Sequence, residues 1–377
     1  MKILTQTPRQ YIRLNEMILG ALSYVSTALR PLVTEEVQLT GAEHLNEHPV
    51  GPYLWLLKHE SWNDVINLAP LYRDIPGTPP ILIASKTGHT PSKLMNWMIE
   101  KVFQPVLVEV HRTNMDEGKT PEQVAEMRAK NEQRLERIRH NFGRGIHALM
   151  FPEGTTVTDG AVLPIKAGCY NLAKMQGADG ELELVTCIPV GLTYDFLSGD
   201  RSLFGHRDLL FVNVGSPFHY APAERAADEP EEAYVKRDIH AFTDDVHDRL
   251  VRLSTITAAQ LASMHLLRRV EANNDRCSED ALLLAVASRA EKLATLDGIN
   301  LDDALRDPER LTERVHNTYR ALERRKFITN GTLDEARIYR EPERREYRAK
   351  NIIRYSANRL HEIAQMDARV REILSGA

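Results

Sequence analysis

His59 and Asp64, with four residues between them, are the side chains of this sequence best suited to acid–base chemistry. An imidazole changes its charge near neutral pH. A carboxylate held against one ring nitrogen fixes the tautomer and stabilises the imidazolium that forms when the other nitrogen takes a proton. The pair therefore predicts a general base with its orienting carboxylate. The same spacing recurs at His111/Asp116 and at His240/Asp245. The spacing alone thus does not separate a catalytic pair from ordinary surface residues.

The residues around His59 predict a strand that is followed directly by a helix. Residues 53–57 form a compact apolar run after Gly51-Pro52, which is typical of a short buried strand. Apolar residues then recur with helical spacing over residues 64–72. Open α/β sheets bind their ligands at the carboxyl edge of the strands. We therefore expect His59 at a ligand-binding edge.

A second motif closes another predicted strand, at residues 147–151. Residues 151–155 read Phe-Pro-Glu-Gly-Thr, which places Glu153 at the end of that strand. Gly154 can adopt backbone conformations that let amides approach a ligand closely. The motif therefore predicts a carboxylate and a flexible backbone at the same edge as His59. Taken alone, it is equally compatible with a turn that carries a solvated glutamate.

Strand and helix patterns alternate between residues 53 and 218. The predicted strands are 53–57, 81–85, 106–110, 147–151, 184–193 and 209–214, and the predicted helices are 64–72, 91–102, 121–141 and 167–175. This alternation predicts an α/β fold with a mostly parallel central sheet flanked by helices. Only helical patterns follow, at 229–253, 258–272, 278–295, 308–326 and 345–374, with a turn at Asn330-Gly331. The expected division is an N-terminal helical segment 1–45, an α/β domain 46–255 and a C-terminal all-helical region 256–377.

Composition places the chain among ordinary globular proteins and argues against nucleic acid as a partner. The 377 residues are 42% hydrophobic and 27% charged, which allows a full core. A net charge of −5 argues against a general nucleic-acid binder, which would carry a basic excess. The three cysteines, Cys169, Cys187 and Cys277, are widely spaced and odd in number, so they predict neither a disulfide framework nor a zinc site. Cysteines of this number and spacing are typical of a protein in the reducing cytosol.

The sequence offers no good transmembrane segment. The most apolar stretch, residues 18–33, is interrupted by Arg30 and Pro31. An amphipathic helix over residues 9–30, the arginine-rich helix 345–374 and a loop around Trp97 could each lie on a membrane surface, although ordinary packing is the favoured reading for both helices. We therefore expect a cytoplasmic protein with peripheral contact at the inner face of the membrane.

Four blocks in order resemble the glycerophospholipid acyltransferase family, which includes the 1-acylglycerol-3-phosphate and glycerol-3-phosphate acyltransferases. They are His59-x4-Asp64, a block that ends at Arg112, the Phe-Pro-Glu-Gly-Thr motif of residues 151–155 with its continuation 163–168, and residues 188–195, which read Ile-Pro-Val-Gly-Leu-Thr-Tyr-Asp. The resemblance covers about residues 50–200. It departs from the family at Thr156-Val157, where Arg-Ser is usual, and at Glu60-Ser61-Trp62 in the first block. Arg112 lacks the usual preceding Phe-Ile.

The resemblance implies transfer of an acyl group from a thioester, acyl-CoA or acyl carrier protein, to a hydroxyl of a glycerol phosphate. His59 would be the general base and Asp64 its orienter. Backbone amides near Gly154 would stabilise the oxyanion. The implied substrate-binding residues are Arg112, Glu153, Gly154, Thr155 and Lys166. No metal and no cofactor besides the thioester co-substrate is implied. The acceptor stays open between lysophosphatidate, which is favoured, and glycerol 3-phosphate.

Two other classes of protein remain to be tested. A metal-dependent hydrolase would use His59, Glu60, Asp64 and His111 as ligands, although their separations match no common zinc pattern. A lipid-binding or scaffold protein would keep the fold without turnover.

Overall fold

The computed structural model describes most of the carboxyl-terminal half of the chain and the sheet that precedes it. The described residues are 23–24, 27–28, 30–31, 34–44, 52–61, 64–67, 81–85, 107–110, 120–142, 146–156, 159–174, 185–202, 205–222, 224–343 and 347–376. Several residues and segments singled out in the sequence lie outside them: His111, Arg112, the predicted helix 91–102 with Trp97, and most of the predicted helix 9–30.

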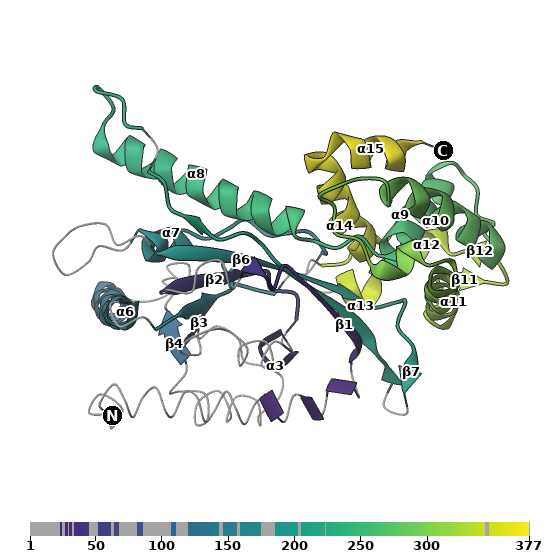
Figure 1. Cartoon of the computed structure of the whole chain (residues 1–377), viewed down its shortest axis with the longest axis horizontal. Helices are drawn as coiled ribbons and strands as arrows, with labels where there is room; N and C mark the ends of the chain where they lie inside the picture. The colour runs from purple at the N-terminus through teal and green to yellow at the C-terminus, as the bar shows by residue number, and fades with distance from the viewer. Residues whose placement is uncertain are drawn as a thin grey trace.

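The centre of the molecule is a mostly parallel sheet (Figure 1). Its strands run in the order β1 (Thr34–Thr40), β9 (Asp208–Val214), β6 (Thr186–Asp195), β2 (Tyr53–Leu57), β5 (Ala148–Met150), β3 (Ile81–Ser85) and β4 (Leu107–Val110). Every neighbouring pair in this order is parallel except β6 and β9. A short strand, β10 (Phe218–His219), pairs antiparallel with β6, and β7 (Arg201–Ser202) pairs with β8 (Gly205–His206) in a separate hairpin. The predicted α/β fold is confirmed.

Strands β2 and β6 are buried along their whole length. All five residues of β2 and all ten of β6 are buried. A parallel strand that is covered on both faces reads as a continuous apolar run rather than an alternating one, as the sequence of β2 does. Gly191 lets the chain after the next helix approach β6, because a Cβ at this position would lie 2.3 Å from the carbonyl oxygen of Leu253.

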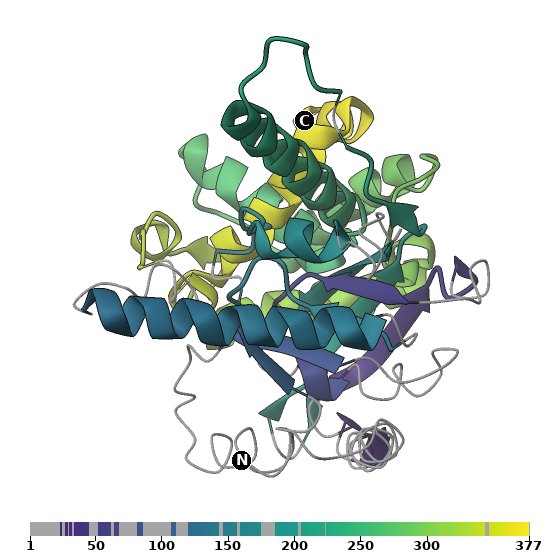
Figure 2. The same cartoon turned by 90° about the vertical axis from the view of Figure 1, so that its left-hand side faces the viewer.

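Helices lie on both faces and at one end of the sheet. The helices α7 (Gly168–Ala173) and α8 (Glu231–Arg252) cover one face, and α3 (Asp64–Asn67) lies on the other (Figure 1). The long helix α6 (Pro121–Phe142) lies across the end of the sheet formed by β3 and β4 (Figure 2). None of the helices in the described part of the chain is both long and apolar enough to cross a bilayer.

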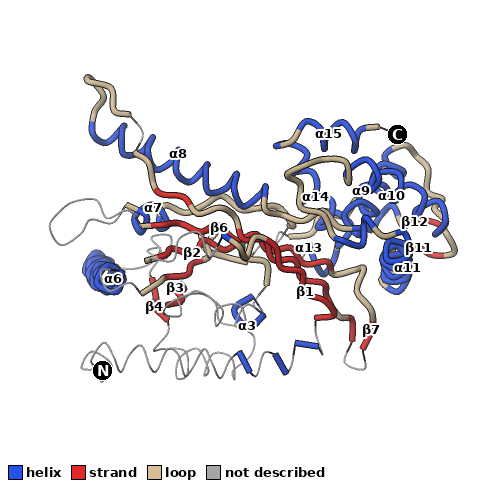
Figure 3. The backbone as a smooth tube through the Cα atoms, in the orientation of Figure 1, coloured by secondary structure: helices blue, strands red, loops and turns tan. Residues whose placement is uncertain are grey.

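The C-terminal region is a helical assembly beside the sheet (Figure 3). Its elements are α9 (Ala258–Glu271), α10 (Glu279–Leu293), the 3-10 helix η4 (Asp303–Arg306), α11 (Pro308–Arg324), α12 (Glu335–Ile338), α13 (Tyr347–Lys350), α14 (Ile352–Met366) and α15 (Ala368–Ser375). A small hairpin, β11 (Ile328–Thr329) and β12 (Thr332–Leu333), interrupts the helices that we expected throughout. Its turn is Asn330-Gly331, and both residues have positive φ, as a two-residue hairpin turn requires.

Two further details differ from the sequence-based expectation. The predicted helix 345–374 is three helices, because Asn351 and Asp367 each accept hydrogen bonds from backbone N–H groups that begin a new helix. Strand β1 lies within the segment 1–45 that we expected to be helical. Its Thr and Val residues suit a strand, and pairing with β9 satisfies its backbone groups. The domain limits themselves stay a prediction.

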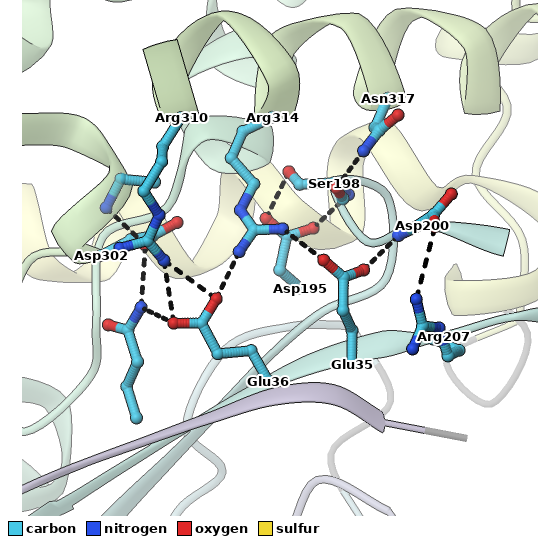
Figure 4. Close-up of polar contacts among 12 residues, drawn as sticks. Glu35, Glu36, Asp195, Ser198, Asp200, Arg207, Asp302, Arg310, Arg314 and Asn317 are labelled. Carbon is cyan, nitrogen blue, oxygen red and sulfur yellow. Dashed lines mark hydrogen bonds and ion pairs between the residues drawn. The ribbon is translucent and has the colours of Figure 1, made fainter. Parts of the chain in front are cut away.

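A network of charged residues joins β1 to α11 (Figure 4). Arg314, whose side chain is only 4% exposed, contacts Glu35 at 3.0 Å and Glu36 at 2.6 Å. Arg310 contacts Glu36 at 2.9 Å. On β6, Asp195 accepts hydrogen bonds from the backbone N–H and the hydroxyl of Ser198, which in turn lies 2.9 Å from the hydroxyl of Thr318 on α11. These contacts attach the helical region to the edge of the sheet.

Candidate active site

Adjacent parallel strands bring His59 and Glu153 to the same edge of the sheet. Strands β2 and β5 pair with Leu56 opposite Met150. His59 and Glu153 each follow these partners by three residues, so they leave the sheet side by side. The backbone N–H of His59 donates to Glu153 Oε1 at 2.8 Å. The strand register thus joins the first and second sequence motifs directly.

Asp64, the first residue of α3, holds the imidazole of His59. The atoms His59 Nδ1 and Asp64 Oδ2 are 2.9 Å apart. The same carboxylate oxygen accepts the backbone N–H groups of Glu60 at 2.8 Å and Ser61 at 3.0 Å. The Asp64 side chain is fully buried, whereas 15% of the His59 side chain is exposed. Because Nδ1 is engaged, Nε2 is the ring nitrogen that remains for proton transfer to or from a ligand.

Tyr194 supports Asp64 from the neighbouring strand. In the β2–β6 pair Leu57 lies opposite Val190, and β6 continues past the end of β2 to reach Tyr194. The Tyr194 hydroxyl donates to Asp64 Oδ1 at 2.8 Å and accepts from Asn67 Nδ2 at 3.0 Å. Burial, together with the charge of Asp64, raises the pKa of Tyr194 well above its ordinary value, so the phenol keeps its proton. Both oxygens of Asp64 are therefore hydrogen-bonded.

Phe151 fixes the plane of the imidazole. The rings of His59 and Phe151 are stacked with their centroids 4.1 Å apart and an angle of 22° between their planes. Phe151 follows β5 directly, so the stack depends on the same strand pair that brings Glu153 to His59. The imidazole is thus held on one side by a carboxylate and across its face by an aromatic ring.

Glu153 faces protein backbone. It is fully buried, and its Oε2 atom accepts the N–H of Leu163 at 2.8 Å. Burial raises the pKa of Glu153 to about 8. Gly154 has a φ of +71°, and its N–H donates to Phe151 O at 2.9 Å in a tight turn. The Glu153 carboxylate therefore ties the backbone of His59 to the segment around Leu163.

Two of the other residues expected to bind substrate, Thr155 and Lys166, belong to the second motif or lie close to it. Thr155 and Lys166 are exposed, and the Lys166 N–H donates to Pro152 O at 2.9 Å, which keeps Lys166 near the second motif. Arg112 lies outside the described residues. Tyr194 stands in the block 188–195 but is not among the site residues expected from the sequence. Its contact with Asp64 depends on the pairing of β6 with β2, which no local sequence pattern indicates.

The structure also distinguishes the pair His59/Asp64 from His240/Asp245, which has the same spacing in the sequence. His240 and Asp245 both lie on the surface of α8, and Asp245 Oδ2 accepts from Arg249 Nε at 2.9 Å. This histidine belongs to a solvated helix face. The pair His111/Asp116 lies outside the described residues.

Of the ligand set considered for a metal site, His111 lies outside the described residues, and Glu60 contacts other side chains. Glu60 accepts from the Tyr355 hydroxyl at 2.8 Å and pairs with Lys58 at 3.1 Å. The Glu60 carboxylate therefore contacts Tyr355 and Lys58 rather than His59 and Asp64. Among the described residues, no group of three or more His, Cys, Asp or Glu side chains is arranged to hold a metal ion. The three cysteines are buried, and burial raises the pKa of Cys169 to about 12.

A comparison with known protein families matches the segment that carries this site. The family model described as Acyltransferase matches residues 36–193. Among solved structures, the chain is similar to the 1-acyl-sn-glycerophosphate (LPA) acyltransferase PlsC from Thermotoga maritima, at 15% identity and a TM-score of 0.37, over 65% of this chain and 85% of that chain. A search of curated proteins gives no match. The segment matched by the Acyltransferase family model, residues 36–193, contains His59, Asp64 and Glu153.

Proposed function

We propose that this protein is an O-acyltransferase of phospholipid biosynthesis. It moves a fatty acyl group from acyl-CoA or acyl carrier protein to a hydroxyl of a glycerol phosphate, and 1-acyl-sn-glycerol 3-phosphate is the favoured acceptor, giving phosphatidate. The observation that carries the proposal is the 2.9 Å contact between His59 Nδ1 and Asp64 Oδ2 at the sheet edge, within the segment matched by the family model.

In the proposed reaction, one nitrogen of the His59 imidazole moves the proton while the other stays bound to Asp64. His59 Nε2 takes the proton of the acceptor hydroxyl as that oxygen attacks the thioester carbonyl carbon. The carbon–oxygen bond forms and the carbonyl becomes a tetrahedral oxyanion. Collapse of this intermediate breaks the carbon–sulfur bond, and the thiolate receives the proton from the imidazolium. The proton and the electron pairs balance without a serine or cysteine nucleophile.

Asp64 makes this proton transfer favourable. Its carboxylate accepts from Nδ1 and stabilises the imidazolium that forms during attack. The N–H groups of Glu60 and Ser61 and the hydroxyl of Tyr194 hold the carboxylate in place, so it needs no reorganisation during the reaction. General-base assistance of this kind contributes about 10²–10⁴ to the rate.

The acceptor phosphate would meet cations at the rim of the site. Lys166, which is exposed near the second motif, and Arg112 are the proposed phosphate ligands, and Thr155 is a proposed hydroxyl contact. Glu153 contributes by holding the His59 backbone, because both of its oxygens accept backbone N–H groups. The N–H of Gly154 is engaged in its own turn, so the oxyanion donor would be a neighbouring amide.

Glycerol 3-phosphate is the alternative acceptor, because residues 188–195 resemble the enzymes that act on it. We propose no metal and no cofactor beyond the thioester co-substrate. We propose that the protein works in the cytoplasm as a peripheral protein on the inner face of the membrane, because a lysophospholipid acceptor resides there.

Thiol release from a long-chain acyl-CoA tests the proposal. Lysophosphatidate and glycerol 3-phosphate are offered separately to the wild type, to His59→Ala and to His240→Ala, with a blank that corrects for the three cysteines. His240→Ala is a matched control, since it removes an exposed histidine with the same His-x4-Asp spacing. We expect acceptor-dependent release by the wild type and the control and none by His59→Ala.

The same assay separates the alternatives. The acceptor that supports the faster release decides between the two branches of the family. No release with either acceptor leads to a repeat with acyl carrier protein as the donor. Failure there as well, with liposome binding that is unchanged in His59→Ala, would replace the enzyme by a lipid-binding protein that keeps the fold.

A further inference from the structure

One face of α14 contacts two loops of the site, the loop that follows His59 and the loop that follows Glu153. Tyr355, Asn358, Arg359 and Glu362 have the spacing of a single helix face. Tyr355 and Arg359 contact Glu60, which follows His59 directly. The other loop, which leads to the Glu153 partner Leu163, is held by three hydrogen bonds: Asn358 Nδ2 to Asp159 O at 2.9 Å, Arg359 Nε to Gly160 O at 3.2 Å, and Val162 N to Glu362 Oε2 at 2.7 Å.

Glu60 is a buried carboxylate between two buried cations. The side chains of Glu60 and Lys58 are fully buried, and that of Arg359 is 3% exposed. Burial would raise the pKa of Glu60, but the charges of Arg359 and Lys58 outweigh it, so this pKa lies below its ordinary value. Tyr355 donates to the second carboxylate oxygen at 2.8 Å. Glu60 is therefore charged, and α14 supplies both Arg359 and Tyr355 as its partners.

The contact with α14 is close enough to restrict the second loop as well. Gly160 has a φ of +93°, and a Cβ at this position would lie 1.9 Å from the carbonyl oxygen of Tyr355. The loop thus reaches the helix backbone itself. Together the two loops hold His59 at two points, its imidazole through Asp64 and its backbone through Glu153.

Glu60 is linked to the catalytic pair through its own backbone. The N–H of Glu60 donates to the same Asp64 oxygen that contacts His59. A shift of Glu60 would therefore move a donor of Asp64 and the residue that adjoins His59. We propose that α14 is part of the acyltransferase site, with Arg359 and Tyr355 as positioning residues that act on His59 and Asp64 through Glu60. The proposal rests on the proposed function and adds the helical region to the site.

Steady-state kinetics test the role of these residues. The variants are Arg359→Met and Tyr355→Phe, and the matched control is Arg354→Met, which removes an arginine of the same helix that pairs with Glu341. We expect kcat to fall roughly 10²-fold in Arg359→Met, as for a misplacement of about 1 Å at a catalytic group, with KM within about twofold of the wild type. Tyr355→Phe should lower kcat less, and Arg359→Lys should recover part of the loss.

Coupling between the residues separates positioning from folding. If Arg359 acts through Glu60, Arg359→Met should lower kcat much less in a Glu60→Gln background than alone. Equal effects in both backgrounds overturn the proposal, and so does an unchanged kcat per folded enzyme in Arg359→Met. If Arg359→Met does not fold, Tyr355→Phe, which removes a single hydroxyl, decides the matter by the same criterion.

A measurement without turnover keeps the proposal separate from the proposed function. The carbethoxylation rate of His59 by diethyl pyrocarbonate, followed on its peptide by mass spectrometry, reports the state of this imidazole. We expect Arg359→Met and Tyr355→Phe to change the rate in the same direction as Asp64→Asn, and Arg354→Met to leave it unchanged. Rates equal to the wild type in both variants overturn the positioning role. A wild type that shows no acyl transfer rejects the proposed function alone.

Discussion

The hydroxyl of Tyr194 donates to Asp64 Oδ1 at 2.8 Å, although the two residues are 130 positions apart in the sequence. Tyr194→Phe removes this donor and also the acceptor for Asn67. We expect the variant to fold, to lose about 1–3 kcal/mol of unfolding free energy because buried polar groups lose a partner, and to lose about tenfold in kcat. Urea unfolding and acyl-transfer kinetics check both effects. An unchanged kcat would show that Asp64 does not need its second hydrogen bond.

Glu153 should make stability depend on pH in an unusual direction. Its pKa is about 8 in the folded protein and near 4.5 when unfolded, so between these values the folded state holds a proton that the unfolded state has released. Its contribution to stability is therefore greatest below about pH 4.5 and falls as the pH rises to about 8. Over this window the loss is on the order of 3–5 kcal/mol.

The pH effect is measured as a difference between the wild type and Glu153→Gln. The variant has no proton to lose at this position, so its advantage relative to the wild type should grow from pH 5 to pH 8. Asp208, with a pKa raised by burial to about 7, and Asp302, with a pKa raised by burial to about 6, contribute with the same sign in both proteins and cancel. Parallel stability curves for the two proteins would rule out a raised pKa at Glu153.

A methyl group at position 160 should separate α14 from the second loop. Gly160→Ala places a Cβ against the carbonyl of Tyr355, in addition to the cost of a positive φ. Gly298→Ala is the matched control, because Gly298 has a φ of +77° and a Cβ added there would meet open space, with nothing within 4 Å. We expect about 1 kcal/mol of destabilisation in the control and about 2–4 kcal/mol, with reduced kcat, in Gly160→Ala. Equal losses would argue against the close contact.

Removing Arg314 should weaken the contact between α11 and strand β1. Arg314→Met leaves Glu35 and Glu36 without this partner (Figure 4). Because both glutamates are partly exposed, we expect a loss of about 2 kcal/mol of unfolding free energy. This is less than the loss expected when one partner of a fully buried ion pair is removed. Arg369→Met, which removes a guanidinium that is mostly exposed in its pair with Asp367, should lower the unfolding free energy by less than about 1 kcal/mol. Thermal unfolding of the two variants measures the difference. Equal losses of unfolding free energy would show that the Arg314 contacts stabilise the protein no more than the Arg369–Asp367 pair does.

Local sequence was sufficient to predict two short strands of the sheet, one of which carries the first motif. The apolar run before His59 predicted the limits of β2 correctly, and the run 81–85 did so for β3. Both strands are short and apolar, and their composition alone identifies them. The breaks at Asn351 and Asp367 were missed, because each depends on a single capping side chain within a continuous helical pattern.

The sequence by itself determined which residues could act as a base and its orienter and that a sheet edge would hold them. Tertiary structure decided which residues support them. Tyr194 reaches Asp64 because β6 lies beside β2, and Arg359 reaches Glu60 from 299 residues away because α14 lies against the two loops. Periodicity reports which face of an element is buried, but it contains no information on which strand or helix covers that face. Strand order and helix docking are set by the free energy of the whole core, and only the folded chain shows them.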